Sequence, residues 1–373
     1  MMLGVLELAG KSSGFLRRRE ASYLPSDGDV HVGERLIRQL GLRAGDEIAG
    51  TTRSGGRGRG PSLETVTTVQ GRSPEILRER PEFNRLGAVH PNELLRLEAN
   101  GAASTQPDFT NRVIDLLCPL GKGQRALIVA PAKAGKTMVL QSIAQGVNLN
   151  YPSAELFILL VDERPEEVFE MEAAGVGEVI ASSFDNPAQR HVALAELTLE
   201  RARRRVELGD DVVLIVDSLT RLARAYNTVE KGSGRTLSGG LDAQSLERPK
   251  RFLGSARRID PAQGGGSLTI IATALVDTGS RMDQVIFEEF KGTGNSELVL
   301  SRELAERRIY PAIDLVASAT RREELLLDPV ALAASHALRQ RIAGMTPINA
   351  MSDLLTDLRR SKTNQDLIRT LAA

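Results

Sequence analysis

Residues 130–137, with the sequence APAKAGKT, decide the fold of this chain. They follow an apolar run, residues 125–130, that is typical of a buried strand, and they precede a helical pattern that begins at Met138. A turn between a strand and a helix presents backbone amides at the helix N-terminus, where they can hold phosphate oxygens. The usual phosphate-binding pattern begins with glycine and this one begins with Ala130, so the prediction depends on the strand, turn and helix context. We expect Lys136 to reach the phosphates and the Thr137 hydroxyl to bind Mg²⁺.

Lysine is scarce in this chain, and its placement supports a phosphate site. The 48 basic residues are 40 arginines and 8 lysines, yet Lys122, Lys133 and Lys136 fall within fifteen residues. A compact ammonium group is favoured at such sites, so these positions look selected rather than incidental.

Further apolar runs predict a mainly parallel sheet that is covered on both faces. Helical patterns separate them, and the pattern over residues 188–206 has one apolar stripe. The arginines near the end of that helix are predicted to form a solvated face, because cations suit a helix C-terminus. The predicted strands are residues 125–130, 156–161, 178–182, 212–216, 268–276 and 313–317, and the arginines are Arg201, Arg203, Arg204 and Arg205.

Two acidic residues follow two of these strands. Glu163 comes after residues 156–161, and Asp217 comes after residues 212–216. Carboxyl ends of parallel strands share one edge of a sheet, so both are expected beside residues 130–137. Asp217 can hold Mg²⁺ and Glu163 can orient or deprotonate an attacking water. The structural alternatives are a helix N-cap for Asp217 and a solvated turn carboxylate for Glu163.

The first sixty residues predict a small antiparallel barrel. Short β segments at residues 4–8, 14–16, 29–32 and 46–52 alternate with turn residues. Four prolines then interrupt the sequence and disfavour long regular elements. We therefore divide the chain into a barrel over residues 1–62, a connector over 63–107 and an α/β ATPase domain over 108–373, with a helical C-terminal end.

Composition excludes several classes of protein. The 373 residues include 48 acidic and 48 basic residues, so contacts with nucleic acid must come from local patches. A single cysteine, Cys118, cannot form an internal disulfide or a multi-thiolate metal site. No apolar run approaches the roughly 20 residues that span a bilayer, and no signal peptide is recognisable, so we expect a soluble cytoplasmic protein.

Longer stretches carry a family resemblance. VDERPEEV (161–168), VDSLTRLARAYNTV (216–229), LSGGLDAQSLERPKRFLGSAR (237–257) and RRIYPAIDL (307–315) resemble the bacterial transcription termination factor Rho family. The resemblance runs nearly continuously from about residue 84 to 327 and more weakly through the N-terminal segments. It implies a cold-shock-like OB-fold barrel before a RecA-like P-loop motor. It also implies a homohexameric, ATP-dependent 5′ to 3′ RNA translocase and helicase that releases nascent RNA from RNA polymerase.

The resemblance also assigns site residues by position. Arg321 is implied to be an arginine finger that acts on the ATP of the neighbouring subunit, with Arg308 as its companion and Arg164 beside the catalytic Glu163. Tyr310 and Met138 are implied to pack on adenine, although a core role for Met138 is as consistent with its type. The nucleotide-binding set is Lys133, Ala134, Gly135, Lys136, Thr137, Met138 and Tyr310, with Mg²⁺ at Thr137 and Asp217. The implied RNA-binding set is Phe15, Arg17, Arg235, Leu237, Ser238, Gly239, Gly240, Gly279, Ser280, Arg281 and Lys291.

The barrel departs from the family pattern. Ser13 stands where the family has a first stacking aromatic, and His31 stands where it has tyrosine. Base stacking contributes roughly 1–3 kcal/mol per base, so we expect weaker RNA capture or a relaxed base preference. The family usually has a small helical subdomain before the barrel, which we do not expect in this chain, so a divergent or shortened member stays open.

Three alternatives remain on sequence grounds. One is a RecA-like ring motor that acts on protein partners, related to rotary ATP synthase or secretion ATPases. The second is a non-enzymatic RNA-binding protein with a structural nucleotide site, against which Glu163 and Asp217 together argue. The third is a paralogue that no longer terminates transcription.

Overall fold

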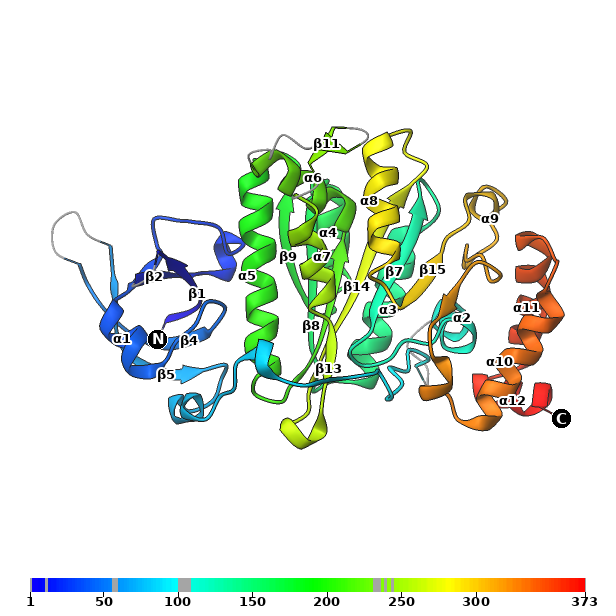
Figure 1. The fold of residues 1–373 in the computed structure, drawn as a ribbon, viewed down its shortest axis with the longest axis horizontal. Helices are drawn as coiled ribbons and strands as arrows, with labels where there is room; N and C mark the ends of the chain where they lie inside the picture. Colours follow the sequence, from blue (N-terminus) through cyan, green and yellow to red (C-terminus); the bar gives the residue numbers. More distant parts are fainter. Residues whose placement is uncertain are drawn as a thin grey trace.

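The chain forms a small barrel joined to a larger α/β domain, with the C-terminal helices at the far end (Figure 1). This computed structural model describes residues 2–10, 13–55, 60–99, 109–230, 236–237, 240–242 and 245–372.

Five strands close into the barrel within the described N-terminal part. Leu6, Leu16, Val30, Ile48 and Val69 fill its interior from alternate strand positions. The strands are β1 (Met2–Ala9), β2 (Ser13–Arg17), β3 (Val30–Val32), β4 (Glu47–Arg53) and β5 (Ser62–Val69), and helix α1 (Glu34–Leu40) precedes β4.

The predicted end of the barrel at residue 62 is too early, because β5 begins there and closes the barrel against β3 and β4. The β-branched sequence of β5 outweighs the prolines that follow it. Beyond β5 the connector holds the short 3-10 helices η2 (Pro74–Arg78) and η3 (Phe83–Arg85) and strand β6 (Ala88–Val89).

The larger domain is built on a mainly parallel sheet. Its path runs β16-β15-β7-β14-β10-β8-β9, and β13 and β6 pair beside β14. The predicted strand at residues 313–317 is wrong, because only Ile313 forms a bridge, to Leu300. The sheet strand is instead residues 296–299, upstream in the sequence. The strand bounds are β7 (Arg125–Pro131), β8 (Glu155–Glu163), β9 (Glu178–Ser183), β10 (Asp211–Asp217), β13 (Arg257–Ile259), β14 (Ser267–Val276), β15 (Ser296–Val299) and β16 (Ala319–Thr320).

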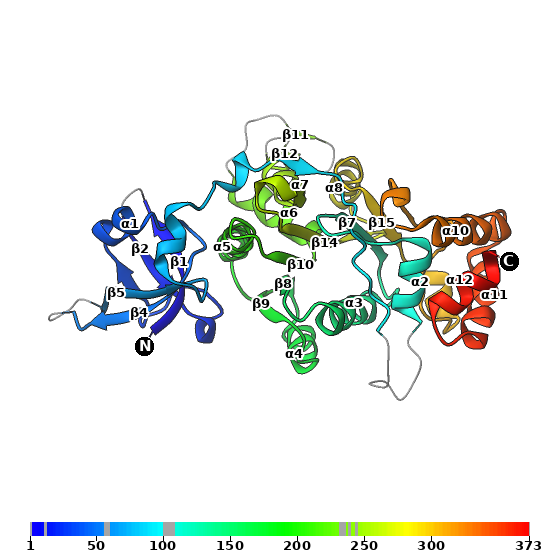
Figure 2. The same cartoon turned by 90° about the horizontal axis from the view of Figure 1, so that it is seen from below.

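Helices cover both faces of this sheet, as the continuous apolar strands predict. In Figure 2, α6, α7 and α8 lie on one side and α3 and α4 on the other. Two apolar cores result, one against each face. The helices are α2 (Thr110–Leu117), α3 (Lys136–Asn150), α4 (Pro165–Ala173), α5 (Ala188–Val206), α6 (Leu219–Val229), α7 (Glu247–Gly254), α8 (Arg281–Lys291), α9 (Arg302–Glu306), α10 (Pro329–Ile342), α11 (Pro347–Arg360) and α12 (Asn364–Ala372).

The barrel packs on α5, and this contact corrects the prediction of a solvated arginine face. Arg201 and Arg204 are buried, at 5% and 7% exposure. The Arg201 guanidinium pairs with Glu178 of the motor domain at 2.8 Å and with Glu47 of the barrel at 2.5 Å. The partners are far away in the sequence, so a helix pattern alone could not reveal them. Arg201 is therefore an interdomain contact, whereas Arg204 pairs with Glu200 and Glu207 of the motor domain.

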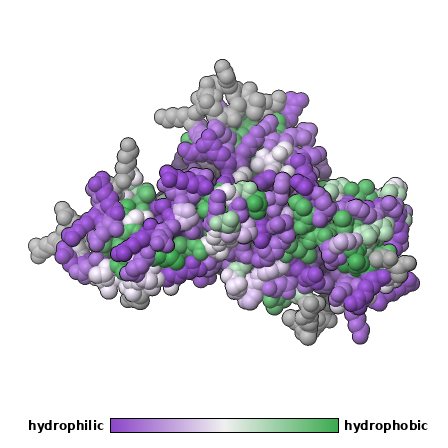
Figure 3. Space-filling view, turned by 60° about the horizontal axis from the view of Figure 1, so that its bottom comes forward, coloured by the Kyte–Doolittle hydropathy of each residue, from purple (hydrophilic) through white to green (hydrophobic). Residues whose placement is uncertain are grey.

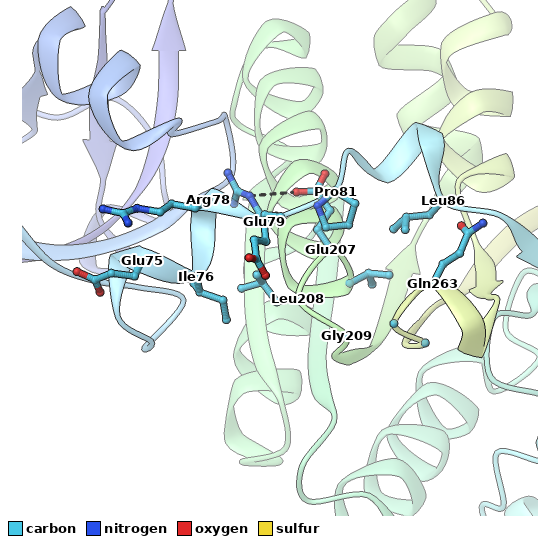
Figure 4. A pocket seen from close by; sticks show the side chains of 14 residues that line it. Glu75, Ile76, Arg78, Glu79, Pro81, Leu86, Glu207, Leu208, Gly209 and Gln263 are labelled. Carbon is cyan, nitrogen blue, oxygen red and sulfur yellow. Dashed lines mark ion pairs between the residues drawn. The ribbon is translucent and has the colours of Figure 1, made fainter.

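A second buried ion cluster joins the barrel, the connector and the motor domain. Arg80 of the connector pairs with Asp46 of the barrel, and its Nε lies 3.5 Å from Glu207 at the end of α5. All three side chains are at most 1% exposed. Beside this cluster lies an open cavity of about 350 Å³ between η2 and the loop at Gly264 (Figure 4).

Hydrophilic residues cover much of the face shown in Figure 3, and apolar residues gather over the C-terminal part at its right. A cavity of about 940 Å³ lies between the connector, α2, α10 and α12, and Leu116, Val330 and Ile368 are among the residues that line it. Among the residues that the structure describes, no helix is long and apolar enough to cross a membrane.

Candidate nucleotide and RNA sites

The turn after β7 has the geometry of a phosphate-binding loop. Gly135, the residue before α3, has φ of 84°, a conformation that glycine adopts without strain. α3 begins at Lys136, so the amides of its first turn face the end of β7. Lys133 is exposed and forms no ion pair with any described residue. The predicted phosphate site therefore presents the backbone amides of the first turn of α3 and the ammonium group of Lys133.

Lys136 joins the three strand ends that the sequence predicts to meet. Its Nζ lies 2.6 Å from Asp217 at the end of β10 and 3.1 Å from Glu163 at the end of β8. The Asp217 carboxylate also accepts a hydrogen bond of 2.7 Å from Thr273 of β14. Burial acts to lower the pKa of Lys136, but the two carboxylates outweigh it and the pKa is raised. Lys136 therefore stays charged between them.

Glu163 is almost completely buried, at 1% exposure. Burial raises the pKa of Glu163 to about 8, aided by a hydrogen bond to Glu167 and by the charge of Asp217, while Lys136 and Arg221 oppose the shift. A buried carboxyl with a pKa near neutrality is suited to general base chemistry. The solvated-turn alternative for Glu163 is therefore inconsistent with its position.

Sequence reasoning missed Arg221. The Arg221 Nε lies 3.2 Å from Glu163, and its Nη1 lies 3.4 Å from the Asp162 carboxylate. Its position could have been inferred, because Ser218 caps α6 and the third helical position turns back toward the strand end. Arg221 and Lys136 thus both lie next to the Oε1 atom of Glu163.

Tyr310 lies beside the phosphate loop. A side chain built on Gly135 would meet the Tyr310 ring at 3.5 Å. Met138 of α3 is 56% exposed, so it is not a core residue. The two predicted adenine contacts are therefore available on the outside of the loop, and Arg164 is exposed at the start of α4.

The structure does not bring Arg308 and Arg321 together. Arg308 comes two residues before Tyr310, on the side of the phosphate loop. The Arg321 amide donates to Asn295, whose amide donates to Arg125 at the start of β7. Since β7 has seven residues, roughly 20 Å of strand separates Arg321 from the phosphate loop of its own chain. Both arginines are exposed, and neither forms an ion pair with a described residue.

On the barrel, Phe15 forms an edge-to-face contact with His31, at 5.6 Å between ring centroids. The Arg17 guanidinium lies 5.4 Å from the centre of the Phe15 ring. Arg17 also pairs with Glu7 and Asp29, so its charge is offset within the barrel. The face that we predict to stack bases thus carries one aromatic ring, one imidazole and one paired cation.

The predicted channel loops are only partly within the described structure. Arg235, Ser238 and Gly239 lie outside the described residues, while Leu237 belongs to the short strand β11 (Thr236–Leu237), which pairs with β12 (Leu241–Asp242). Gly240 is exposed. Gly279, Ser280 and Arg281 line a cavity of about 420 Å³ at the start of α8, and Lys291 is exposed at its end.

The donor set fits Mg²⁺ better than a transition metal. Within the described ranges, no group of three histidine, cysteine or carboxylate side chains could hold a metal ion. Mg²⁺ is commonly bound through one or two protein oxygens together with substrate phosphates, which matches Thr137 and Asp217. The ammonium group of Lys136 against Asp217 shows that a cation is accommodated there.

Comparison with known proteins agrees with this geometry. Residues 2–75 match the family model described as Rho termination factor, RNA-binding domain. Residues 110–320 match that of the ATP synthase alpha/beta family, nucleotide-binding domain. The transcription termination factor Rho of Haemophilus influenzae is 52% identical over 369 residues, which cover 99% of this chain and 87% of that protein.

The chain belongs to the transcription termination factor Rho family. The Rho of Gemmatimonas aurantiaca is 55% identical over 358 residues, which cover 96% of this chain and 48% of that protein, so the chain spans about half of that relative. The Rho of Escherichia coli strain K12 is 52% identical and 87% covered.

Solved structures show the fold beyond the Rho family. An ATPase from a type III secretion system of pathogenic bacteria has a TM-score of 0.62 and 23% identity, covering 85% of this chain and 92% of its own. The assembled ATPase EscN of enteropathogenic E. coli has a TM-score of 0.58 and 20% identity, covering 99% of this chain and 100% of its own. At such identities these likenesses show a RecA-like fold alone, and they give no support to a protein-directed motor.

Proposed function

We propose that this protein is an RNA-dependent ATP hydrolase that terminates transcription by moving 5′ to 3′ along nascent RNA and releasing it from RNA polymerase. The observation that carries the proposal is the meeting of Lys136, Glu163 and Asp217 at one sheet edge, in a chain whose barrel matches the Rho RNA-binding domain. The protein would act in the cytoplasm, where nascent RNA is made.

In this proposal Lys133 and Lys136 hold the phosphates of ATP, and the amides of the α3 N-terminus share that task. When ATP enters, its phosphates replace the carboxylates as partners of Lys136. Glu163 is then free to take a proton from the attacking water, with Arg221 keeping its carboxylate in place. When bound at Thr137 and Asp217, Mg²⁺ would neutralise charge on the phosphates.

Arg321 would act in trans. It lies at the end of β7 opposite the phosphate loop, so a finger role requires a neighbouring copy of the chain. A guanidinium supplied in this way can accelerate phosphoryl transfer by about 10³–10⁵. The proposed assembly is a homohexameric ring, in which the loops at Gly240 and Gly279–Arg281 contact RNA and the barrel face at Phe15 captures it.

The test is ATP hydrolysis with a panel of homopolymer RNAs at fixed salt. We expect RNA to stimulate hydrolysis and Lys136→Ala to abolish it. Lys122→Ala serves as the control, because Lys122 pairs with Glu93 and Asp211 away from the phosphate loop. Hydrolysis that no RNA stimulates, or that persists at full rate in Lys136→Ala, would contradict the proposed function.

A further inference from the structure

Asn295 extends the pairing of β15 and β16 to the backbone of Arg321. It lies in the turn between α8 and β15, in the sequence GTGNSEL. Its carbonyl accepts from the Arg321 amide at 2.9 Å, and its own amide donates to the Arg125 carbonyl at 2.9 Å. Its side-chain Oδ1 accepts from the Arg125 amide at 2.8 Å. One residue therefore connects Arg321 to the first residue of β7 by three hydrogen bonds.

Gln124 braces this connection. Its side chain is 1% exposed, and its Nε2 donates to the Asn295 Oδ1 at 2.9 Å and to the Asn295 carbonyl at 3.1 Å. Buried hydrogen bonds of this kind are costly to break, because each lost partner leaves a desolvated polar group. Asn295 is thus fixed on both its side-chain and backbone sides.

The connection holds two like charges near each other. Arg125 donates through its guanidinium to the carbonyls of Thr293 and Ala256, at 2.9 and 3.3 Å, but it pairs with no carboxylate of the described chain. Burial and then the charge of Arg321 lower the pKa of Arg125. Two guanidinium groups without an acidic partner favour an anion supplied from outside the chain.

We propose that Asn295, braced by Gln124, is a positioning residue that sets Arg321 for the nucleotide of the neighbouring subunit. The inference rests on the proposed function. Asn295 itself touches no nucleotide. It fixes Arg321 to the first residue of β7, and the other end of β7 leads into the phosphate loop. The arginine finger and the phosphate loop of one subunit are therefore joined by one strand inside the sheet.

The experiment compares Asn295→Ala with the unmodified full-length protein in RNA-stimulated hydrolysis. We expect kcat to fall about 100-fold, because a misplacement near 1 Å costs that much, while the affinity for ADP changes less than about twofold. ADP with aluminium fluoride and Mg²⁺ mimics the transition state, so its affinity is expected to fall with kcat. A purely structural role would weaken the binding of ADP and of the analogue equally.

Two further variants keep the test decisive. Gln124→Met keeps the length of the side chain and removes both donors, and it is expected to lower kcat about tenfold in the same pattern, even if Asn295→Ala does not fold. Thr269→Val is the matched control, because Thr269 is fully buried at the same sheet edge and its hydroxyl accepts a hydrogen bond of 2.8 Å from the Gly123 amide. It is expected to reduce thermal stability and leave kcat unchanged.

The outcomes separate the inference from the proposed function. If the unmodified protein shows no RNA-stimulated hydrolysis, the proposed function is wrong. If the unmodified protein hydrolyses ATP and the variants Asn295→Ala and Gln124→Met both keep its kcat, only the positioning role is wrong. A kcat loss in Thr269→Val as large as in Gln124→Met would also overturn the positioning role.

Discussion

Replacing Arg80 with alanine tests whether the barrel is locked onto the motor domain by buried charge. The Arg80 side chain is fully buried, and its partners Asp46 and Glu207 are 0% and 1% exposed. Without Arg80, Asp46 keeps a hydrogen bond from the Arg43 amide at 2.7 Å but loses its buried cation. Breaking a buried pair from one side costs about 3–5 kcal/mol, because the remaining charge is left unpaired. Glu207 retains other partners, so we expect a loss near 3 kcal/mol.

The assay is urea denaturation followed by circular dichroism, since the chain has no tryptophan for fluorescence. The matched control is Arg85→Ala in the same connector, where Arg85 and Glu82 form a pair at 79% and 54% side-chain exposure. Exposed pairs contribute about 0–1 kcal/mol, so this control is expected to change little. Equal losses in free energy of unfolding for the two variants would refute the reasoning.

Two other perturbations probe the hydrolytic centre and the barrel. In the folded protein the pKa of Glu163 is about 8, whereas an unfolded chain releases this proton near pH 4.3. The wild-type protein therefore loses stability as the pH rises between these values. The loss is at most about 1.4 kcal/mol per pKa unit. Glu163→Gln is therefore expected to abolish hydrolysis and to raise the free energy of unfolding at about pH 9 but not at about pH 4. The exposed control Glu166→Gln is not expected to show this pattern. An equal stability gain at both pH values would contradict the reasoning. Ser13→Phe restores a stacking ring beside Phe15. In a titration it is expected to strengthen the binding of a short cytidine-rich RNA by roughly 1–3 kcal/mol and to leave the affinity for ADP unchanged. Unaltered RNA binding would count against the stacking interpretation.

Local patterns in the sequence predicted much of the motor domain. The helix at residues 188–206 appears with the expected bounds, because its apolar stripe faces the sheet and tertiary packing reinforces the pattern. Glu163, Asp217 and Lys136 meet as expected, because strand ends in a parallel sheet share an edge. The strand at residues 62–69 is not predicted, because the prolines that follow it disfavour long regular elements.

Long-range contacts account for most of what the sequence could not predict. The burial of Arg201 depends on Glu47, which lies on another domain and follows no local spacing. The apolar run at residues 313–317 forms a turn, because Asp314 accepts from the amides of Val316 and Ala317 at 3.0 Å. Ile313 and Leu315 are buried, whereas Val316 is 50% exposed. The attachment of Arg321 through Asn295 likewise depends on how β15 and β7 lie side by side.

The pairing of Arg17 with Glu7 and Asp29 has a consequence for how RNA binding responds to ions. An unpaired arginine that meets a phosphate releases counterions from the nucleic acid, which makes affinity fall steeply as salt increases. In the proposed RNA complex, Arg17 would exchange a carboxylate for a phosphate, and the freed carboxylate would attract a cation as the RNA gives one up. The net ion release at Arg17 would then be close to zero, so this residue would add little to the salt dependence of RNA binding.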